Sequence, residues 1–186
     1  MLTRIVAVLA KQNDSFDREI LTAMAEDTYE VVAGLQHVTP VLVTSIPELE
    51  EIVWPGTEVI TIADDTPLRE IFGKLGAEQA AIVSADAPDL PPLLIGKLFR
   101  ELGRAPLAVC PSLYGGAVAI AAALPLPDWV HPDLDADNPV QAMREQAPGR
   151  RMIATGPGWH RLRKPEDLRL LDPGLEGWDN LRALVQ

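Results

Sequence analysis

Residues 80–90 read AAIVSADAPDL, and this stretch decides the fold. Its first five residues are uncharged and mostly apolar, which is typical of a short strand buried on both faces of a sheet. The run then ends on a polar turn with two carboxylates, Asp86 and Asp89, and Pro91 and Pro92 open a helix after it. A buried strand that passes through a polar turn into a helix is the repeating unit of an α/β sheet.

The same alternation extends in both directions from this stretch. We expect strands at residues 3–10, 39–44, 58–62, 80–84, 107–110, 115–120 and 151–154, and helices at 15–35, 47–53, 66–75, 91–102, 139–146, 166–171 and 175–184. The predicted fold class is therefore α/β, a three-layer α/β/α sandwich with a mostly parallel, Rossmann-like sheet. We expect residues 1–186 to form a single domain, with an acidic, proline-rich loop at about residues 122–138.

Composition limits the partners. The chain carries 27 acidic and 16 basic side chains, a net charge of −11, which argues against nucleic acid and against an anionic membrane surface. It has no apolar run of about 20 residues and no signal peptide, so we expect a soluble cytoplasmic protein. The single cysteine, Cys110, excludes an internal disulfide and has the apolar neighbours of a buried thiol. The four tryptophans suit a core or an interface, which leaves a homo-oligomer open.

The carboxyl ends of the predicted parallel strands are the place to look for ligands. Asp86 follows a buried strand, where a carboxylate is costly unless it faces a cleft or coordinates something. Magnesium takes one or two carboxylates together with substrate phosphates, so Asp86 is a candidate Mg²⁺ ligand. Asp89 is either a second ligand or the N-cap of the helix that Pro91 opens.

An acidic cluster in the loop, Asp133, Asp135 and Asp137, has the spacing of the first ligands of an EF-hand. However, Asn138 stands where that motif needs glycine, and Arg144 stands where it needs glutamate. A solvated acidic loop is therefore the favoured interpretation, with a weak metal site as the alternative.

Two further segments leave alternatives open. Gly115 and Gly116 form a plain turn or allow a ligand to approach the backbone closely. Residues 156–161, GPGWHR, are basic and aromatic, and either face an anionic substrate or form a solvated turn. The three histidines lack the spacing of a zinc motif.

Three segments together resemble the GT-A-like nucleotidyltransferase superfamily, nearest to phospholactate guanylyltransferase-like and small bacterial glycosyltransferase-like proteins. Residues 17–27 are similar to the first helix of that superfamily, residues 85–90 to its Asp-x-Pro-x-Leu segment, and residues 164–168 to its Thr-Pro-Glu-Asp-Leu segment. Their order and separation match over about residues 3–171. The resemblance implies a GT-A-like fold and a nucleotide or nucleotide-sugar ligand.

The resemblance also implies site residues. It assigns Asp86 as the metal ligand and catalytic residue, with Mg²⁺ as the cofactor. The substrate-contacting residues that it implies are Lys11, Arg18, Asp89, Tyr114, Gly115, Gly116 and Arg163.

Three departures separate this chain from the superfamily pattern. The loop after the first strand is short and has no glycine, and Tyr114–Val118 replace a polar Asp-Gly-Gly-Thr-Asn run. Arg161 and Arg163 stand where an Asp-x-Asp pair supplies the second metal carboxylate. Such an arginine can pair directly with a phosphate. Two hypotheses follow, a metal-dependent transferase and a catalytically degenerate relative that serves as a non-enzymatic binding or assembly module.

Overall fold

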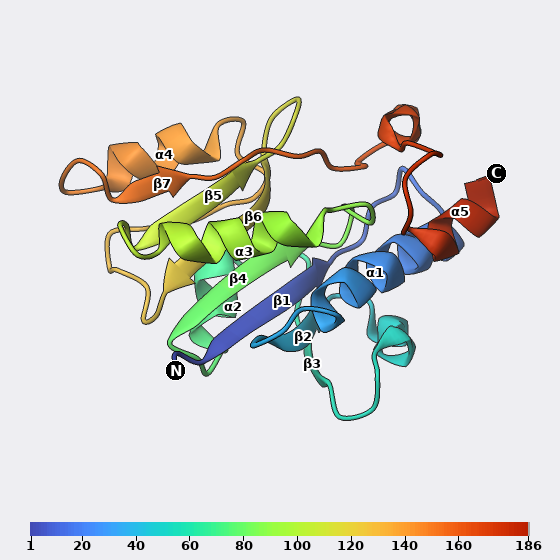
Figure 1. The fold of residues 1–186 in the computed structure, drawn as a ribbon, viewed down its shortest axis with the longest axis horizontal. Coiled ribbons are helices and arrows are strands. Elements are labelled where there is room, and N and C mark those ends of the chain that lie inside the picture. The colour runs from blue at the N-terminus through green and yellow to red at the C-terminus, as the bar shows by residue number, and fades with distance from the viewer. Residues whose placement is uncertain (186) are drawn as a thin grey trace.

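A computed structural model describes residues 1–185 and confirms the α/β fold. Its seven-stranded sheet has the order β3-β2-β1-β4-β6-β5-β7 (Figure 1). The strands are β1 (Arg4–Ala10), β2 (Thr39–Thr44), β3 (Glu58–Thr61), β4 (Gln79–Ser84), β5 (Leu107–Pro111), β6 (Ala117–Ala123) and β7 (Ile153–Thr155). Strand β6 runs antiparallel to its neighbours β4 and β5, and the other pairs are parallel.

Helices cover both faces of the sheet. They are α1 (Arg18–Ala33), α2 (Leu68–Gly73), α3 (Pro92–Glu101), α4 (Pro139–Gln146) and α5 (Asp179–Val185), with short 3₁₀ helices η1 (Pro47–Ile52) and η2 (Pro165–Leu170). Apolar side chains of α1, α3 and η1 pack on one face, and those of α2 and α4 pack on the other. The three predicted layers are therefore present.

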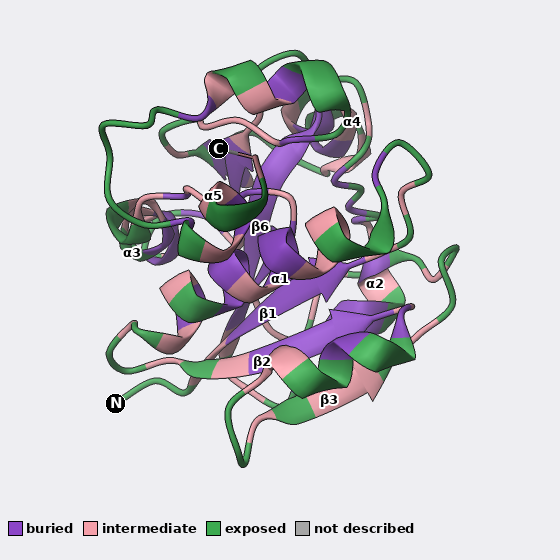
Figure 2. Cartoon of the chain, turned by 90° about the vertical axis from the view of Figure 1, so that its right-hand side faces the viewer, coloured by how far each residue is buried: buried purple, intermediate pink, exposed green. Residues whose placement is uncertain are grey.

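The central strands explain why the sequence showed apolar runs rather than alternation. In β1, Val6 and Val8 face α1 and α3, while Ala7 and Leu9 face the opposite layer. Figure 2 shows β1 and β2 buried over most of their length. A strand covered on both faces has no polar side to alternate with.

The C-terminal helix is attached to the first helix through a buried carboxylate. Asp27 is 2% exposed. It accepts hydrogen bonds from the backbone N–H groups of Asn180 (3.0 Å) and Leu181 (2.8 Å). Burial raises the pKa of Asp27, and the hydrogen bonds from Leu181 and Asn180 only partly offset this. The first N–H groups of a helix have no acceptor within the helix itself. The carboxylate of Asp27 supplies acceptors for these groups at the start of α5.

Several details differ from the expectation or confirm it. Strand β6 begins at Ala117, because Gly115 and Gly116 have φ values of 101° and 80° and belong to the preceding turn. Residues 124–138 contain no helix or strand, as expected for the acidic loop.

Cys110 is buried as predicted, and burial raises its pKa to about 12. None of the described helices is long and apolar enough to cross a bilayer.

Candidate functional site

A cavity of about 780 Å³ lies beyond the carboxyl ends of β1 and β4. It is walled by the loop after β1, the turn after β4, the acidic loop at residues 131–135, and the segment that contains Arg161 and Arg163. Asp86 lines it at the end of β4, in the position that the rule for parallel strands predicts. The cavity brings together residues that are distant in the chain, as when Asn13 Nδ2 donates to the carbonyl of Arg163, 150 positions away (2.9 Å).

The side chain of Arg161 is the centre of the charged wall. Its Nε donates to Asp86 Oδ1 (2.9 Å) and its Nη2 to Asp86 Oδ2 (3.0 Å), a bidentate pair. Its Nη1 donates to Asp135 Oδ1 (2.7 Å) and to the carbonyl of Leu134 (3.3 Å). The Arg161 side chain is 8% exposed and that of Asp86 is 17% exposed. One guanidinium therefore joins the end of β4 to the acidic loop.

Electrostatics keep this cluster charged. Burial acts to lower the pKa of Arg161, but the carboxylates of Asp86 and Asp135 outweigh it and raise that pKa above its usual range. Burial likewise acts to raise the pKa of Asp135. Arg161, with smaller effects from Arg163 and Lys11, reverses this and lowers it. The guanidinium is a fixed positive charge between two carboxylates.

The residues around Asp86 do not fit the Mg²⁺ ion that the family resemblance implies. Both Asp86 oxygens already accept hydrogen bonds from Arg161. Within residues 1–185, no group of three or more His, Cys, Asp or Glu side chains could hold a metal. A cation at Asp86 would have to displace the guanidinium and would be repelled by it at short range. Arg161 thus places a positive charge against both oxygens of Asp86.

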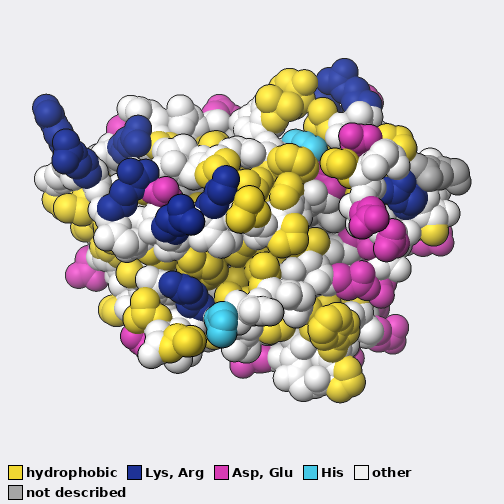
Figure 3. Space-filling view, viewed as in Figure 1, with side chains coloured by type: hydrophobic (Ala, Val, Ile, Leu, Met, Phe, Trp, Pro, Cys, Tyr) yellow, Lys and Arg dark blue, Asp and Glu magenta, His cyan; other side chains and the backbone are white. Residues whose placement is uncertain are grey.

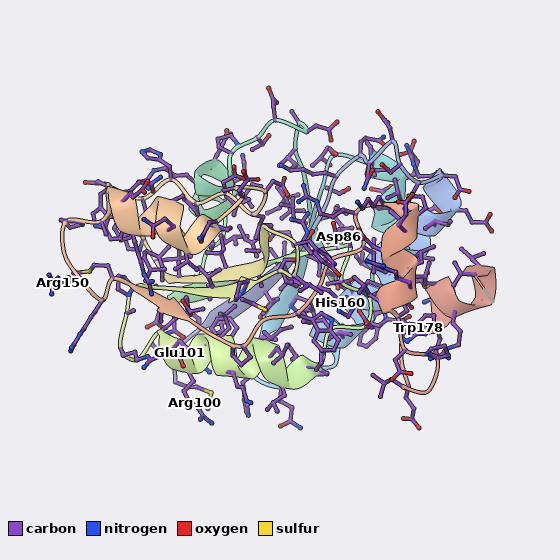
Figure 4. The ribbon with its side chains drawn as sticks, turned by 90° about the horizontal axis from the view of Figure 1, so that it is seen from above. Asp86, Arg100, Glu101, Arg150, His160 and Trp178 are labelled. Atoms are coloured by element: carbon purple, nitrogen blue, oxygen red, sulfur yellow. The ribbon has the colours of Figure 1, made fainter. Side chains whose placement is uncertain are left out.

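Asp89 is paired with the same distant segment as Asp86. Its Oδ2 lies 2.7 Å from His160 Nε2, and its Oδ1 accepts a hydrogen bond from Trp159 Nε1 (3.3 Å). Figure 4 shows His160 close to Asp86. The helix-cap interpretation of Asp89 is wrong, because α3 is preceded by Pro91 and has no side-chain cap.

Residues 159–161 therefore face carboxylates of their own chain rather than solvent. Sequence reasoning missed this pairing of Trp159, His160 and Arg161 with Asp86 and Asp89. The sequence held one signal for it: two carboxylates three residues apart, Asp86 and Asp89, and a distant pair of basic residues, His160 and Arg161, that could neutralise them.

The predicted phosphate contacts divide into two groups. Lys11 and Arg163 line the cavity, and Arg163 Nη2 lies 3.5 Å from Asp135 Oδ1. Arg18 does not line it, and its Nη1 instead donates to Glu48 Oε2 (3.2 Å) at the surface.

The paired glycines form the turn between β5 and β6, outside the cavity lining. Gly116 donates its N–H to the Asp137 carbonyl (3.3 Å), and a Cβ on Gly116 would lie 2.8 Å from the carbonyl oxygen of Leu134. The adjacent Tyr114 is 72% exposed. The absence of a Cβ at Gly116 therefore allows the backbone of the acidic loop, rather than a ligand, to pack closely against this turn.

Comparison with known proteins identifies the fold. A solved structure from Desulfovibrio desulfuricans, assigned to the nucleotide-diphospho-sugar transferases, superposes with a TM-score of 0.69 over 98% of this chain and 95% of its own, at 15% identity. The chain has the GT-A-like nucleotidyltransferase fold. No known family model matches the sequence, and no curated protein matches it.

Two other structures with this GT-A-like fold hold ligands. The CMP:2-keto-3-deoxy-manno-octonic acid synthetase in complex with CTP matches with a TM-score of 0.62 and 14% identity, over 90% of this chain and 96% of that one. Rv0371c of Mycobacterium tuberculosis in complex with manganese matches with a TM-score of 0.57 and 14% identity, over 94% of this chain and all of that one. At these identities the likeness concerns the fold, and the side chains of the site are particular to this chain.

Proposed function

We propose that this chain binds a nucleotide or a nucleotide sugar in the cavity at the ends of β1 and β4. The observation that carries the proposal is the cavity itself, about 780 Å³ in volume and placed at the carboxyl ends of the central strands. Small-molecule sites typically have volumes of roughly 300–1,000 Å³. A synthetase with the same fold binds CTP.

The lining divides into an apolar part and a charged part. Met24, Ile46 and Leu49 give an apolar wall that suits the flat face of a base. Lys11 and Arg163 supply the cations that can approach phosphate oxygens. Arg163 has only one longer contact with Asp135 (3.5 Å), whereas Arg161 is bonded to two carboxylates. We expect phosphates of the ligand on the Lys11 and Arg163 side of the cavity.

Binding is proposed to need no Mg²⁺ at Asp86, because Arg161 holds both oxygens of that carboxylate. The role proposed for Asp86 is accordingly that of a positioning residue, which fixes Arg161 and through it the acidic loop. Manganese in the Rv0371c structure belongs to that protein.

The Arg161–Asp86 pair also favours a second candidate function, a relative that binds its ligand without transferring it. Nucleotidyl transfer depends on cations that relieve the charge developing on phosphate oxygens. A guanidinium bonded to Asp86 and Asp135 has little capacity left for that task. In this candidate the chain is a non-enzymatic binding or assembly module.

Calorimetry and thermal unfolding with CTP, GTP and a UDP-sugar test binding, with excess Mg²⁺ and separately with EDTA. We expect one of these ligands to raise the melting temperature equally in both conditions, because a ligand of the native state stabilises it. Lys11→Gln with Arg163→Gln should weaken binding, whereas the control Arg18→Gln, outside the cavity, should not. No saturable binding of any ligand contradicts the proposed function.

A parallel assay of the bound ligand separates the two candidates. Phosphorus NMR of the nucleotide, incubated with the chain and Mg²⁺, reports any pyrophosphate or nucleoside diphosphate released. With sugar and sugar-phosphate acceptors present to receive the transferred group, binding without turnover supports the non-enzymatic candidate, and release that Asp86→Ala abolishes in a folded variant supports the transferase.

A further inference from the structure

A second cavity of about 780 Å³ lies at the opposite end of the sheet and shares no lining residue with the first. It is formed where β5 and β7 begin, next to the end of α4 and the loop that follows it. Four arginines line this cavity: Arg104, Arg144, Arg150 and Arg151. Figure 4 shows Arg150 at one end of the molecule, far from Asp86 and His160.

The concentration of charge at this place is unusual for this chain. Four of the 16 basic residues of a protein with a net charge of −11 line one cavity, and none of its lining residues is acidic. Figure 3 shows Lys and Arg side chains gathered at this end of the molecule, whereas Asp and Glu are frequent at the other end. Positive charges held near one another repel, so the arrangement costs free energy unless an anion joins it.

The guanidinium groups are largely unengaged. Arg104 pairs with Glu101 in the adjoining turn, and Arg144 Nη2 has one long hydrogen bond to the Ile153 carbonyl (3.4 Å). Within residues 1–185, Arg150 and Arg151 have no carboxylate within 4.0 Å and make no side-chain hydrogen bond. Several guanidinium N–H groups beside the second cavity are therefore available as hydrogen-bond donors to a ligand.

We propose that this cavity binds a small anion that carries two or more phosphoryl groups. Guanidinium forks match phosphate oxygens in bidentate geometry, and several forks in one cavity favour a ligand with several charged groups. Met152, Ile153 and Ala147 add an apolar surface that can contact the uncharged part of such a ligand. The site is separate from the proposed nucleotide cavity and does not depend on it.

Calorimetric titration of the whole chain with pyrophosphate and tripolyphosphate at low ionic strength tests the proposal. We expect saturable binding that weakens as salt is added and a rise in melting temperature with ligand concentration. Replacing Arg144, Arg150 and Arg151 together by Gln should weaken binding by about tenfold or more, because charge-assisted hydrogen bonds are removed. All three side chains are exposed, so the variant is expected to fold.

A matched control distinguishes the two cavities, since Lys11 and Arg163 could also attract the anion. Affinity that survives in Lys11→Gln/Arg163→Gln and is lost in the triple variant supports the proposal. The opposite result places the anion in the first cavity and overturns it.

Two further measurements complete the test. Amide chemical-shift changes confined to residues 144–155 on titration locate the site in the unmodified chain, without relying on any variant. Citrate, a polycarboxylate, should bind more weakly than tripolyphosphate. Equal binding of citrate, shifts elsewhere, or no saturable binding each overturns the proposal.

Discussion

The two cavities at opposite ends of the sheet both contain arginines, but the buried arginine of the first is paired with carboxylates and most arginines of the second are not. Arg161 in the first cavity is 8% exposed and bonded to Asp86 and Asp135. Arg150 and Arg151 in the second are exposed, and no carboxylate of the described chain contacts them. Burial explains the difference, because a buried guanidinium without a partner is strongly destabilising and an exposed one is hydrated.

This difference changes how a basic residue in a cavity is interpreted. A basic side chain that lines a cavity indicates an anionic ligand only when no carboxylate of the same chain neutralises that side chain. By that criterion the first cavity withholds Arg161 and offers Lys11 and, with a single longer contact to Asp135, Arg163. The second cavity offers its arginines other than Arg104, which is paired with Glu101.

The largest effect is expected for Arg161→Ala. It removes the partner of Asp86, a carboxylate that is 17% exposed, and should lower the free energy of unfolding by about 3–5 kcal/mol. Denaturant unfolding measures this. The control Arg163→Ala, whose side chain is 45% exposed, should cost less than about 1 kcal/mol.

A double-mutant cycle sharpens the first prediction. Because Arg161→Ala and Asp86→Ala remove the same pair, their effects should fall short of additivity by about 1–3 kcal/mol. Equal effects of Arg161→Ala and Arg163→Ala, or full additivity in the cycle, would show that Arg161 is not stabilised by its pairing with Asp86 in the way described.

A smaller loss is expected for Gly116→Ala, which tests the fit between the β5–β6 turn and the acidic loop. Gly116 has a φ of 80°, and an added Cβ would lie 2.8 Å from the Leu134 carbonyl oxygen. We expect a loss of about 1–3 kcal/mol in the free energy of unfolding. The control is Gly73→Ala, where nothing lies within 4 Å, and it should not destabilise the chain.

Acid should weaken the ion pair between Arg161 and Asp135 of the acidic loop. The folded pKa of Asp135 is lowered, so its contribution is present above the ordinary carboxyl pKa of about 3.9 and is lost as the pH falls through the folded value. The Asp135 side chain is 50% exposed, which limits the effect to under about 1 kcal/mol. Unfolding curves of the wild type and Asp135→Asn should differ at pH ~7 and converge in acid once the pH has fallen below the lowered pKa of Asp135; curves that stay apart in acid contradict this.

The smallest effect is expected in the second cavity. Replacing Arg150 and Arg151 by Gln should change the free energy of unfolding by no more than about 0.5 kcal/mol, because exposed side chains without partners contribute little. A loss comparable with that of Arg161→Ala would mean that these arginines serve the fold rather than a ligand.

Much of the fold could be predicted because strands buried on both faces are uninterrupted apolar runs, as residues 80–84 illustrate. The antiparallel direction of β6 could not, since an apolar run such as AVAIAAA has no polarity of its own. Its direction follows from the short turn that connects it to β5.

The site was predictable to a lesser extent. Asp86 lies in the expected cavity because strand ends fix its place. Its partner Arg161 is 75 residues away in the chain, and only the packed structure determines that contact. Asp89 failed as a helix cap for the same reason, since the tertiary contact with His160 takes the place of a local one.

The position of Arg161 near the end of the chain also affects the order in which the first cavity is built. During synthesis, β1, β4 and the acidic loop emerge before residues 159–163, and α5 emerges after them. The wall that Arg161 completes can therefore form only after residue 161 has been synthesised, and the attachment of α5 to Asp27 only after residues 180–181 have been. A nascent chain that stops short of residue 161 would lack this part of the cavity wall and would leave Asp86 without its guanidinium partner.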